Sequence, residues 1–400
     1  MRRKINNCFN WLSKNKRLLN NLLIVIILIR FILLNYVNWN WGLLTTGKSG
    51  VQFGQDSSRY IDGAAHLLSN VPFEGTEIFY LGYVFLIAFV KILGAGLEMA
   101  LLIQLAFALL ASYAIFDLAR FITSNKTVGI IAAGLFLSNP FITTWHLYIH
   151  TDSMYFSFLI FSTWSIYKTI EKHHLKYYIF SFAIVCITAL VRPSGWILLP
   201  LYFIFILSFS NLKTLIKYIL SLIIICLFFI SAAYLPLFNK AIQEAPAAEM
   251  LLNGGVIWGR PDQNINMPKD PNLEKKNWIY AYNYIVKHPL ACLKLATYRV
   301  ATELLPVHRP WISTKFKIRF LIWVLPAYLL AVFGVFAYKK NAAVIIALTI
   351  IVTNIFVISL THADHEFRFL LYILPLIYLL AVCGLYNVFN KCKSWAHINK

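Results

Sequence analysis

Acidic residues are scarce in this chain, so the segments where they stand beside basic side chains are candidate sites. The 400 residues include 36 Lys and Arg but only 16 Asp and Glu. The polar stretch Gly54–Leu68 holds Asp56, Arg59, Tyr60 and Asp62 within seven positions. A carboxylate can accept the proton of an attacking hydroxyl or amine, and Arg can hold a phosphate through two parallel hydrogen bonds. We expect this stretch to be the centre of the active site.

The same residue types recur at the ends of other apolar runs. Histidines, arginines and further acids at one water–membrane boundary would suit a phosphate-bearing lipid substrate and an acid/base-assisted group transfer. The segments are His150-Thr151-Asp152, Val191-Arg192-Pro193-Ser194, His362-Ala363-Asp364-His365-Glu366-Phe367-Arg368, and the long-loop residues Arg260, Asp262, Arg299, His308 and Arg309.

Each of these residues also has a purely structural interpretation. Asp56 and Asp152 stand before or at the start of a predicted helix, where an acid can serve only as a cap. Arg192 and Arg368 stand at the membrane interface, where an arginine can anchor or snorkel. His362 and His365 have the alternative of being solvated loop residues, as a lone histidine often is. Asp62 lies off the side of the helix that carries Asp56 and Tyr60, so we expect it to be a solvated or structural charge.

Composition indicates that the elements which position these residues are membrane helices. The chain is 60% hydrophobic and 13% charged, whereas a soluble protein carries about a quarter charged residues. Its mean hydropathy is +0.67, and repeated apolar runs have the length of transmembrane helices. The net charge of +20 comes from Lys and Arg in short loops and at the N-terminus, as the positive-inside bias requires. Nucleic-acid binding is therefore not expected.

These runs predict an all-α polytopic membrane protein with about ten transmembrane helices and both termini in the cytoplasm. The apolar run Phe79–Leu93 is short, and if it spanned, the basic loops that follow would lie outside. We interpret it as an in-plane or re-entrant helix, although spanning stays an alternative. Asp56 is expected to precede a second in-plane helix from Ser57 to about Ser69. The expected spans are 18–37, 97–120, 127–148, 152–170, 175–191, 194–210, 214–237, 318–338, 342–360 and 367–390.

Three regions follow from this topology. Residues 1–237 form an N-terminal transmembrane module, whose first outer loop (38–96) carries Asp56. Residues 238–317 form a long outer loop with interfacial helices at Asn277–His288 and Pro289–Leu305. Residues 318–400 form the C-terminal transmembrane helices and a cytoplasmic tail.

Four motifs in this order resemble those of a known superfamily. The chain resembles the GT-C polytopic glycosyltransferases that use polyprenyl-phosphate sugars, most of all the bacterial branch related to protein O-mannosyltransferases and the lipid A aminoarabinose transferase. The resemblance covers about residues 50–390. It rests on Asp56-Ser57-Ser58-Arg59-Tyr60 with Tyr80-Leu81-Gly82-Tyr83, on Ser138-Asn139-Pro140 leading to His150-Thr151-Asp152-Ser153, on Leu190-Val191-Arg192-Pro193-Ser194-Gly195, and on His365-Glu366-Phe367-Arg368-Phe369 with Pro375.

The resemblance implies a membrane glycosyltransferase that acts at the periplasmic face of the cytoplasmic (inner) membrane. It would move a sugar, with inversion, from a polyprenyl-phosphate donor to a lipid, glycan or protein acceptor. Asp56 would be the catalytic base, Asp152 a second acidic catalytic residue, and Arg192 and Arg368 a clamp for the lipid phosphate. The expected substrate-binding residues are Arg59, Tyr60, Tyr83, His150, Arg192, Arg260, His365, Glu366 and Arg368.

Two points stay open at this stage. Family members often carry two adjacent acids in the first loop, whereas Asp56 is followed by Ser57, so a divalent metal held by an acidic pair is doubtful and no cofactor is assigned. The alternative function is a transporter or flippase of a lipid-linked sugar, which predicts broken helices and inverted repeats. The chain has no internal repeat. A third interpretation is a non-catalytic assembly subunit.

Overall fold

The computed structural model describes residues 15–47, 49–73, 76–210, 212–234, 247–269 and 278–398. Within these ranges the chain forms helices and two isolated β-bridges, Gln52 with Tyr148 and Ile257 with Ala363, but no strand. Among the described helices, five are long and apolar enough to cross a membrane. They are α2 (Lys16–Thr46), α5 (Leu97–Thr123), the pair α16 (Thr314–Trp323) and α17 (Leu325–Ala337) taken together, α18 (Ala342–Leu360) and α19 (Arg368–Ile398).

The remaining predicted spans also coincide with helices, although these are shorter, less apolar or broken. They are α6 (Lys126–Leu137), α8 (Thr151–Lys172), α9 (Leu175–Val191), α10 (Leu198–Ser208) and α11 (Thr214–Tyr234). The chain is thus an all-α polytopic membrane protein, while the number of ten spans stays a prediction. The basic N-terminal residues 1–4 lie outside the described residues, as does Asn277 at the predicted start of α14 (Trp278–Lys287).

The span predicted over 127–148 coincides with two helical segments rather than with one continuous helix. Helix α6 ends at Leu137, α7 (Pro140–Thr144) starts a new direction, and the two segments are bent by 45°. Pro140 disfavours a helical conformation at the preceding Asn139, which is extended at φ −76° and ψ 119°. The Asn139 side chain then accepts hydrogen bonds from the backbone N–H groups of Phe141 and Ile142 and caps α7.

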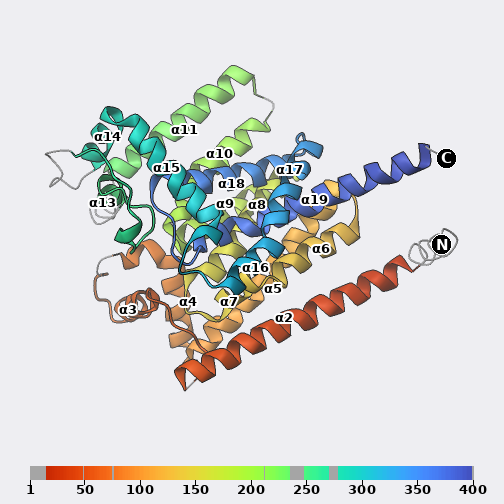
Figure 1. The fold of residues 1–400 in the computed structure, drawn as a ribbon, viewed down its shortest axis with the longest axis horizontal. Coiled ribbons are helices and arrows are strands. Elements are labelled where there is room, and N and C mark those ends of the chain that lie inside the picture. The colour runs from red at the N-terminus through yellow and green to blue at the C-terminus, as the bar shows by residue number, and fades with distance from the viewer. Residues whose placement is uncertain are drawn as a thin grey trace.

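Helix α3 (Ser57–Leu68) and helix α4 (Leu81–Ile92) pack against each other beside the bundle (Figure 1). A Cβ at Gly63 of α3 would lie 3.1 Å from Val84 of α4, so glycine permits this close approach. Gly82 similarly brings α4 against the end of α9, where its Cβ would lie 2.9 Å from the backbone nitrogen of Val191. The 12 residues of α4 extend for about 18 Å, short of the ~30 Å hydrocarbon core. This length favours the in-plane interpretation of Phe79–Leu93, which remains a prediction.

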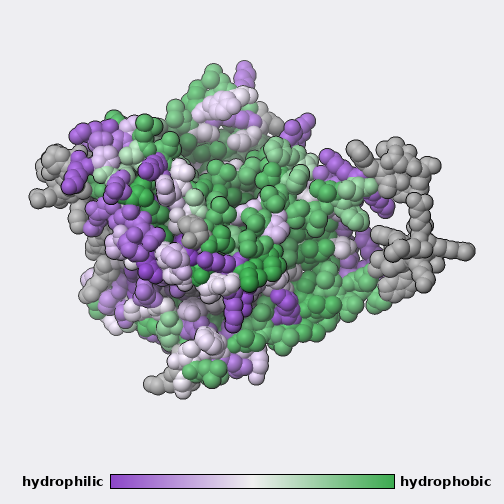
Figure 2. All heavy atoms as spheres, in the orientation of Figure 1, coloured by the Kyte–Doolittle hydropathy of each residue, from purple (hydrophilic) through white to green (hydrophobic). Residues whose placement is uncertain are grey.

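The segment predicted to be a long outer loop contributes a second, smaller apolar cluster. Helix α13 (Ala247–Leu252), α14 and α15 (Pro289–Leu304) surround Leu251, Ile257, Tyr284 and Leu295. Hydrophilic residues gather over this part and over α3 at the left of Figure 2, and again at the right near the end of α19, with a hydrophobic surface between them. Helix α3, which follows Asp56 directly, lies in the first of these hydrophilic regions.

Candidate active site

Asp56 reaches the bundle because the segment before α3 lies along residues 147–149. The Gln52 backbone N–H donates to Leu147 O, and the Ile149 N–H donates to Gln52 O, each at 2.9 Å. The Ser57 hydroxyl accepts from the Gly54 N–H and donates to Ile149 O at 2.7 Å. These bonds place the start of α3 beside His150, 94 positions further along the chain.

The Asp56 carboxylate faces three cationic or protonatable side chains. Its oxygens lie 3.2 Å from His150 Nε2, 3.3 Å from Arg59 Nη1 and 3.4 Å from Arg368 Nη1. Asp56 stands at the N-cap position of α3 but makes no side-chain capping bond, so the interpretation that it serves only as a cap is wrong. Burial by itself would raise the pKa of Asp56, but the hydrogen bond with His150 and the charges of Arg59 and Arg368 outweigh it. The pKa is therefore well below its ordinary value.

Asp152 occupies the first turn of α8 and is fully buried, with 0% of its side chain exposed. Its carboxylate contacts His150 Nδ1, accepts a hydrogen bond from the Tyr372 hydroxyl at 2.6 Å and lies 3.5 Å from Arg192 Nη1. By contrast, 26% of the Asp56 side chain is exposed. Of the two predicted catalytic acids, only Asp56 is open to a substrate in this conformation, while Asp152 can act through the groups it holds.

His150 connects these two acids. Its Nδ1 faces Asp152, and its Nε2 lies between Asp56 Oδ2 and Arg368 Nη1, the latter at 3.0 Å. Burial opposes a charge on this ring, but Asp152 and Asp56 outweigh it and raise the pKa of His150 above its ordinary value. The protonated ring can donate to Asp152 through Nδ1 and to Asp56 through Nε2, whereas in the neutral ring Nε2 can accept from Arg368.

Arg368 is positioned by a tight turn before α19. Its Nε donates to Asp364 Oδ2 at 2.8 Å, and Asp364 Oδ1 accepts from the Glu366 N–H at 2.8 Å. Phe367 has a φ of +62°, a left-handed conformation that is costly for a bulky residue. Such strain persists only where surrounding contacts hold it, and Arg309 lies over the Phe367 ring at 4.1 Å.

Beneath this turn lies Glu303 of α15, which sequence reasoning did not single out. Its two oxygens accept from the backbone N–H groups of Asp364 at 2.8 Å and Leu370 at 2.9 Å. Arg309 lies 3.9 Å from Glu303 and donates to the carbonyl oxygens of Asp364 and Thr302. Burial and the nearby Asp364 raise the pKa of Glu303 to about 8. The only sequence signal for Glu303 was that acids are rare.

Asp56, His150, Asp152 and Arg368 form one cluster of contacts, the Asp56 cluster. The other predicted residues lie against this cluster, at its rim or in a separate region. Tyr60 is buried with its ring against Tyr80, Tyr83 and His150. Tyr83 is also buried, and its hydroxyl donates to Gln104 at 2.7 Å.

Arg192 donates to Thr151 at 2.8 Å and lies over the Tyr372 ring. Sequence reasoning did not single out Tyr372, and Asp364 was noted only as part of its motif.

Arg59, His365 and Glu366 are more exposed and lie at the rim. Glu366 Oε2 is 3.9 Å from Arg368 Nε, and His365 Nε2 is 4.0 Å from Glu366. Arg260 instead packs over Trp311 at 4.5 Å, and none of its described contacts joins it to the Asp56 cluster. The side chain of His308 lies outside the described part of the chain.

A cavity of about 250 Å³ is lined in part by Glu366 and Phe367, the two residues that precede Arg368. Glu366 and Arg319 supply its charges, and its walls include Phe141, Trp145 and Phe316. Arg368 lies over the Trp145 ring at 5.8 Å, so the cavity and the Asp56 cluster share a wall. An apolar chain attached to a phosphate would find aromatic walls next to an arginine here.

Comparison with known proteins bears on the helices that carry part of this site. A family model described as dolichyl-phosphate-mannose-protein mannosyltransferase matches residues 80–234, less than half of the chain. The match includes His150, Asp152 and Arg192 but not Asp56 or Arg368. No curated protein matches the chain. Together with the helical membrane fold, the family match indicates a membrane glycosyltransferase. Over the segment from α4 to α11, the chain is similar to the dolichyl-phosphate-mannose-protein mannosyltransferases.

Proposed function

We propose that this protein transfers a sugar from a polyprenyl-phosphate donor to a lipid, glycan or protein acceptor, with Asp56 as the base. The reaction would take place at the outer face of the cytoplasmic membrane. The observation that carries the proposal is the position of Asp56. It is a partly exposed carboxylate, 3.4 Å from an arginine that adjoins an aromatic cavity.

The charges around Asp56 suggest how the donor would activate it. The hydrogen bond with His150 and the charges of Arg59 and Arg368 outweigh burial and lower the pKa of Asp56, so they hold it ionised but also make it a weak base. A donor phosphate would compete for both guanidinium groups, since Arg binds phosphate by two parallel hydrogen bonds. The carboxylate would then lose part of its stabilisation and become more basic. Donor binding would in this way prepare Asp56 for proton transfer.

The proposed chemical step is a single displacement. The acceptor hydroxyl gives its proton to Asp56, and its oxygen forms a bond to the anomeric carbon on the side opposite the phosphate. The bond from that carbon to the phosphate oxygen breaks, and the polyprenyl phosphate leaves with the electron pair. A phosphate needs no protonation to leave, so one carboxylate suffices, unlike the pair in a glycosidase. The configuration at the anomeric carbon inverts.

The buried members of the cluster would act by positioning. Asp152 of α8 faces His150. It also contacts Tyr372 of α19 and Arg192 in the turn after α9, and so joins these three elements. We therefore propose Asp152 as a residue that fixes His150 and Arg192, rather than one that touches substrate.

The test is mass spectrometry of surface glycans and lipids from cells that have or lack the gene. Complementation with wild type should restore the sugar-modified product, and Asp56→Asn should not, with equal protein in the membrane. Asp62→Asn is the matched control, because Asp62 is an exposed acid on the same helix. A full product signal with Asp56→Asn would rule out Asp56 as the base.

A transporter of a lipid-linked sugar is the second candidate. The bend of 45° between α6 and α7 favours it, because broken helices are common in transporters. Purified protein given donor and acceptor separates the two functions. A transferase forms a new glycosidic bond in detergent, whereas a transporter only moves the intact lipid across a bilayer.

A further inference from the structure

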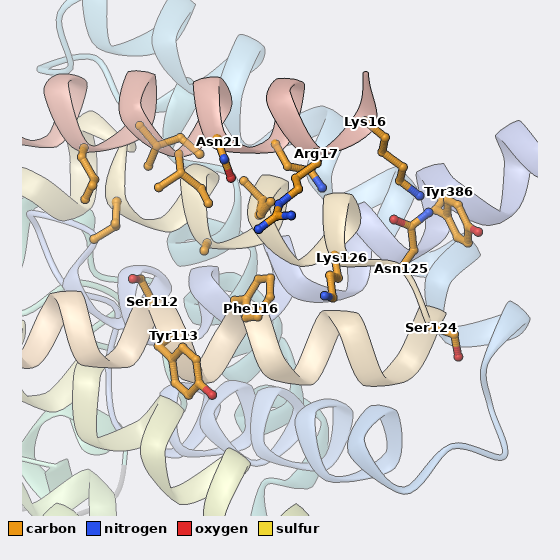
Figure 3. Close-up of a pocket in the computed structure, with 17 residues that line it drawn as sticks. Lys16, Arg17, Asn21, Ser112, Tyr113, Phe116, Ser124, Asn125, Lys126 and Tyr386 are labelled. Carbon is orange, nitrogen blue, oxygen red and sulfur yellow. The ribbon is translucent and has the colours of Figure 1, made fainter. Parts of the chain in front are cut away.

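A second cavity, of about 1070 Å³, lies at the far end of α2 from Asp56. Figure 3 shows it between α2 and α5, closed at one end by the turn that leads into α6. The 31 residues of α2 extend for about 46 Å, and the chain reaches the Asp56 segment only after the helix ends. None of its lining residues belongs to the Asp56 cluster or to the cavity near Arg368.

Cations gather at one end of this cavity. Lys16 and Arg17 come from the first turn of α2, and Lys126 comes from the first turn of α6. In Figure 3, Arg17 extends from α2 into the space above Lys126. None of the lining residues is acidic, and no ion pair involves these three side chains in the part of the chain that the structure describes. The N-terminal ends of α2 and α6 add their partial positive charge.

Away from these cations the lining is mixed, with an apolar strip along α2 and polar side chains that include Asn21, Ser112 and Tyr113. Ile24, Ile27 and Leu28 of α2 face Phe116 of α5 and Leu137 of α6 across it. Helix α2 is held to α6 by the hydrogen bond from Thr127 to Asn20 at 3.0 Å and by the packing of Ile27 on Gly134. Elsewhere α2 is mostly exposed, with only 11% of its apolar span buried. A ligand for this cavity must have an anionic end and an apolar body along α2.

We propose that this cavity binds an anionic phospholipid of the bilayer. The phosphate of its head group would contact Arg17, Lys16 and Lys126, and an acyl chain would lie along Ile24 and Leu28. Basic pockets between transmembrane helices recognise anionic head groups in this way. The bound lipid would hold α2 against α5, where the protein's own contacts are few. The proposal is independent of the transferase activity.

The experiment is native mass spectrometry of the full-length protein, released from micelles with equal amounts of phosphatidylglycerol and phosphatidylcholine. Wild type should retain phosphatidylglycerol in preference. The double variant Arg17→Gln/Lys126→Gln should weaken that retention by about tenfold or more, the loss expected from removing two charges near a lipid phosphate. Ala133→Trp, which fills the cavity without changing charge, should weaken it as well.

The matched control is Lys339→Gln/Lys340→Gln, which removes two exposed positive charges at the turn between α17 and α18. It should leave the retention unchanged. Equal loss in this control would show a general surface-charge effect and overturn the site. Equal retention of phosphatidylcholine by wild type would also overturn it, as would displacement of phosphatidylglycerol by inorganic phosphate.

Discussion

Arg368 Nη1 lies 3.4 Å from Asp56 Oδ2, although the two residues are 312 positions apart. The Nε atom of the same guanidinium is held by Asp364 at 2.8 Å. Arg368 thus joins the segment before α3 to the turn before the last helix. The fork of the guanidinium group allows both contacts at once.

Arg368→Lys should raise the KM for the donor by on the order of tenfold, because one ammonium group cannot reproduce the fork. The melting temperature should change little, since the charge is kept. Initial rates at varied donor concentration with purified protein measure this effect. Arg120→Lys, where Arg120 lies near Asp117 at the other end of the bundle, should leave KM unchanged. An unaltered KM for Arg368→Lys would contradict a phosphate-binding role.

Substitution of His150 should have an effect on stability that depends on pH. Asp152 and Asp56 outweigh the burial of His150 and raise its pKa, so the folded state binds the proton more tightly than the unfolded chain. The stabilisation is complete below the ordinary histidine pKa of about 6.5 and is lost as pH rises through the raised pKa. Melting curves should therefore show that the difference between wild type and His150→Gln is largest below about pH 6.5 and shrinks as the pH rises above it.

The same melting curves in an Asp56→Asn background provide the control for His150. One of the two carboxylates that favour the imidazolium is then absent, so the pH-dependent difference should be smaller. A difference that grows as pH rises would show that His150 is held neutral in the fold.

Asp152→Asn should abolish transfer and also destabilise the protein. The change leaves the buried Arg192 without its counter-charge and His150 with Asp56 alone, and breaking a buried ion pair costs about 3–5 kcal/mol. Asp117→Asn is the matched control, because Asp117 is a buried acid that pairs with Lys168 at 2.8 Å, remote from the site. It should lose stability yet keep transfer activity per folded molecule. Activity retained in Asp152→Asn would refute the positioning role.

Glu303→Gln tests the support beneath the Arg368 turn. An amide has only one acceptor oxygen, so either the Asp364 or the Leu370 N–H would lose its partner. A buried unpaired N–H costs about 1–3 kcal/mol, and Arg368 should shift with its turn. We expect a lower melting temperature and a raised donor KM. Glu98→Gln, an exposed acid at the start of α5, should change neither. A KM equal to wild type would limit Glu303 to a structural role.

The sequence alone determined the class of the protein and the types of residue at its site. Long apolar runs have no other stable environment than a membrane, and helical spacing sufficed to separate Asp56 and Tyr60 from the exposed Asp62. The motifs around His150, Arg192 and Arg368 were found because charged residues are conspicuous at the ends of such runs.

The tertiary structure decided which of these residues meet. Helix packing, which spacing cannot reveal, joins Asp56 to Arg368, buries Asp152 beneath His150 and leaves Arg260 on Trp311. It also brings Glu303 under the Arg368 turn and opens a basic cavity at the far end of α2. Local sequence sets the face of a helix on which a side chain lies. Only the packing of distant helices determines what that face touches.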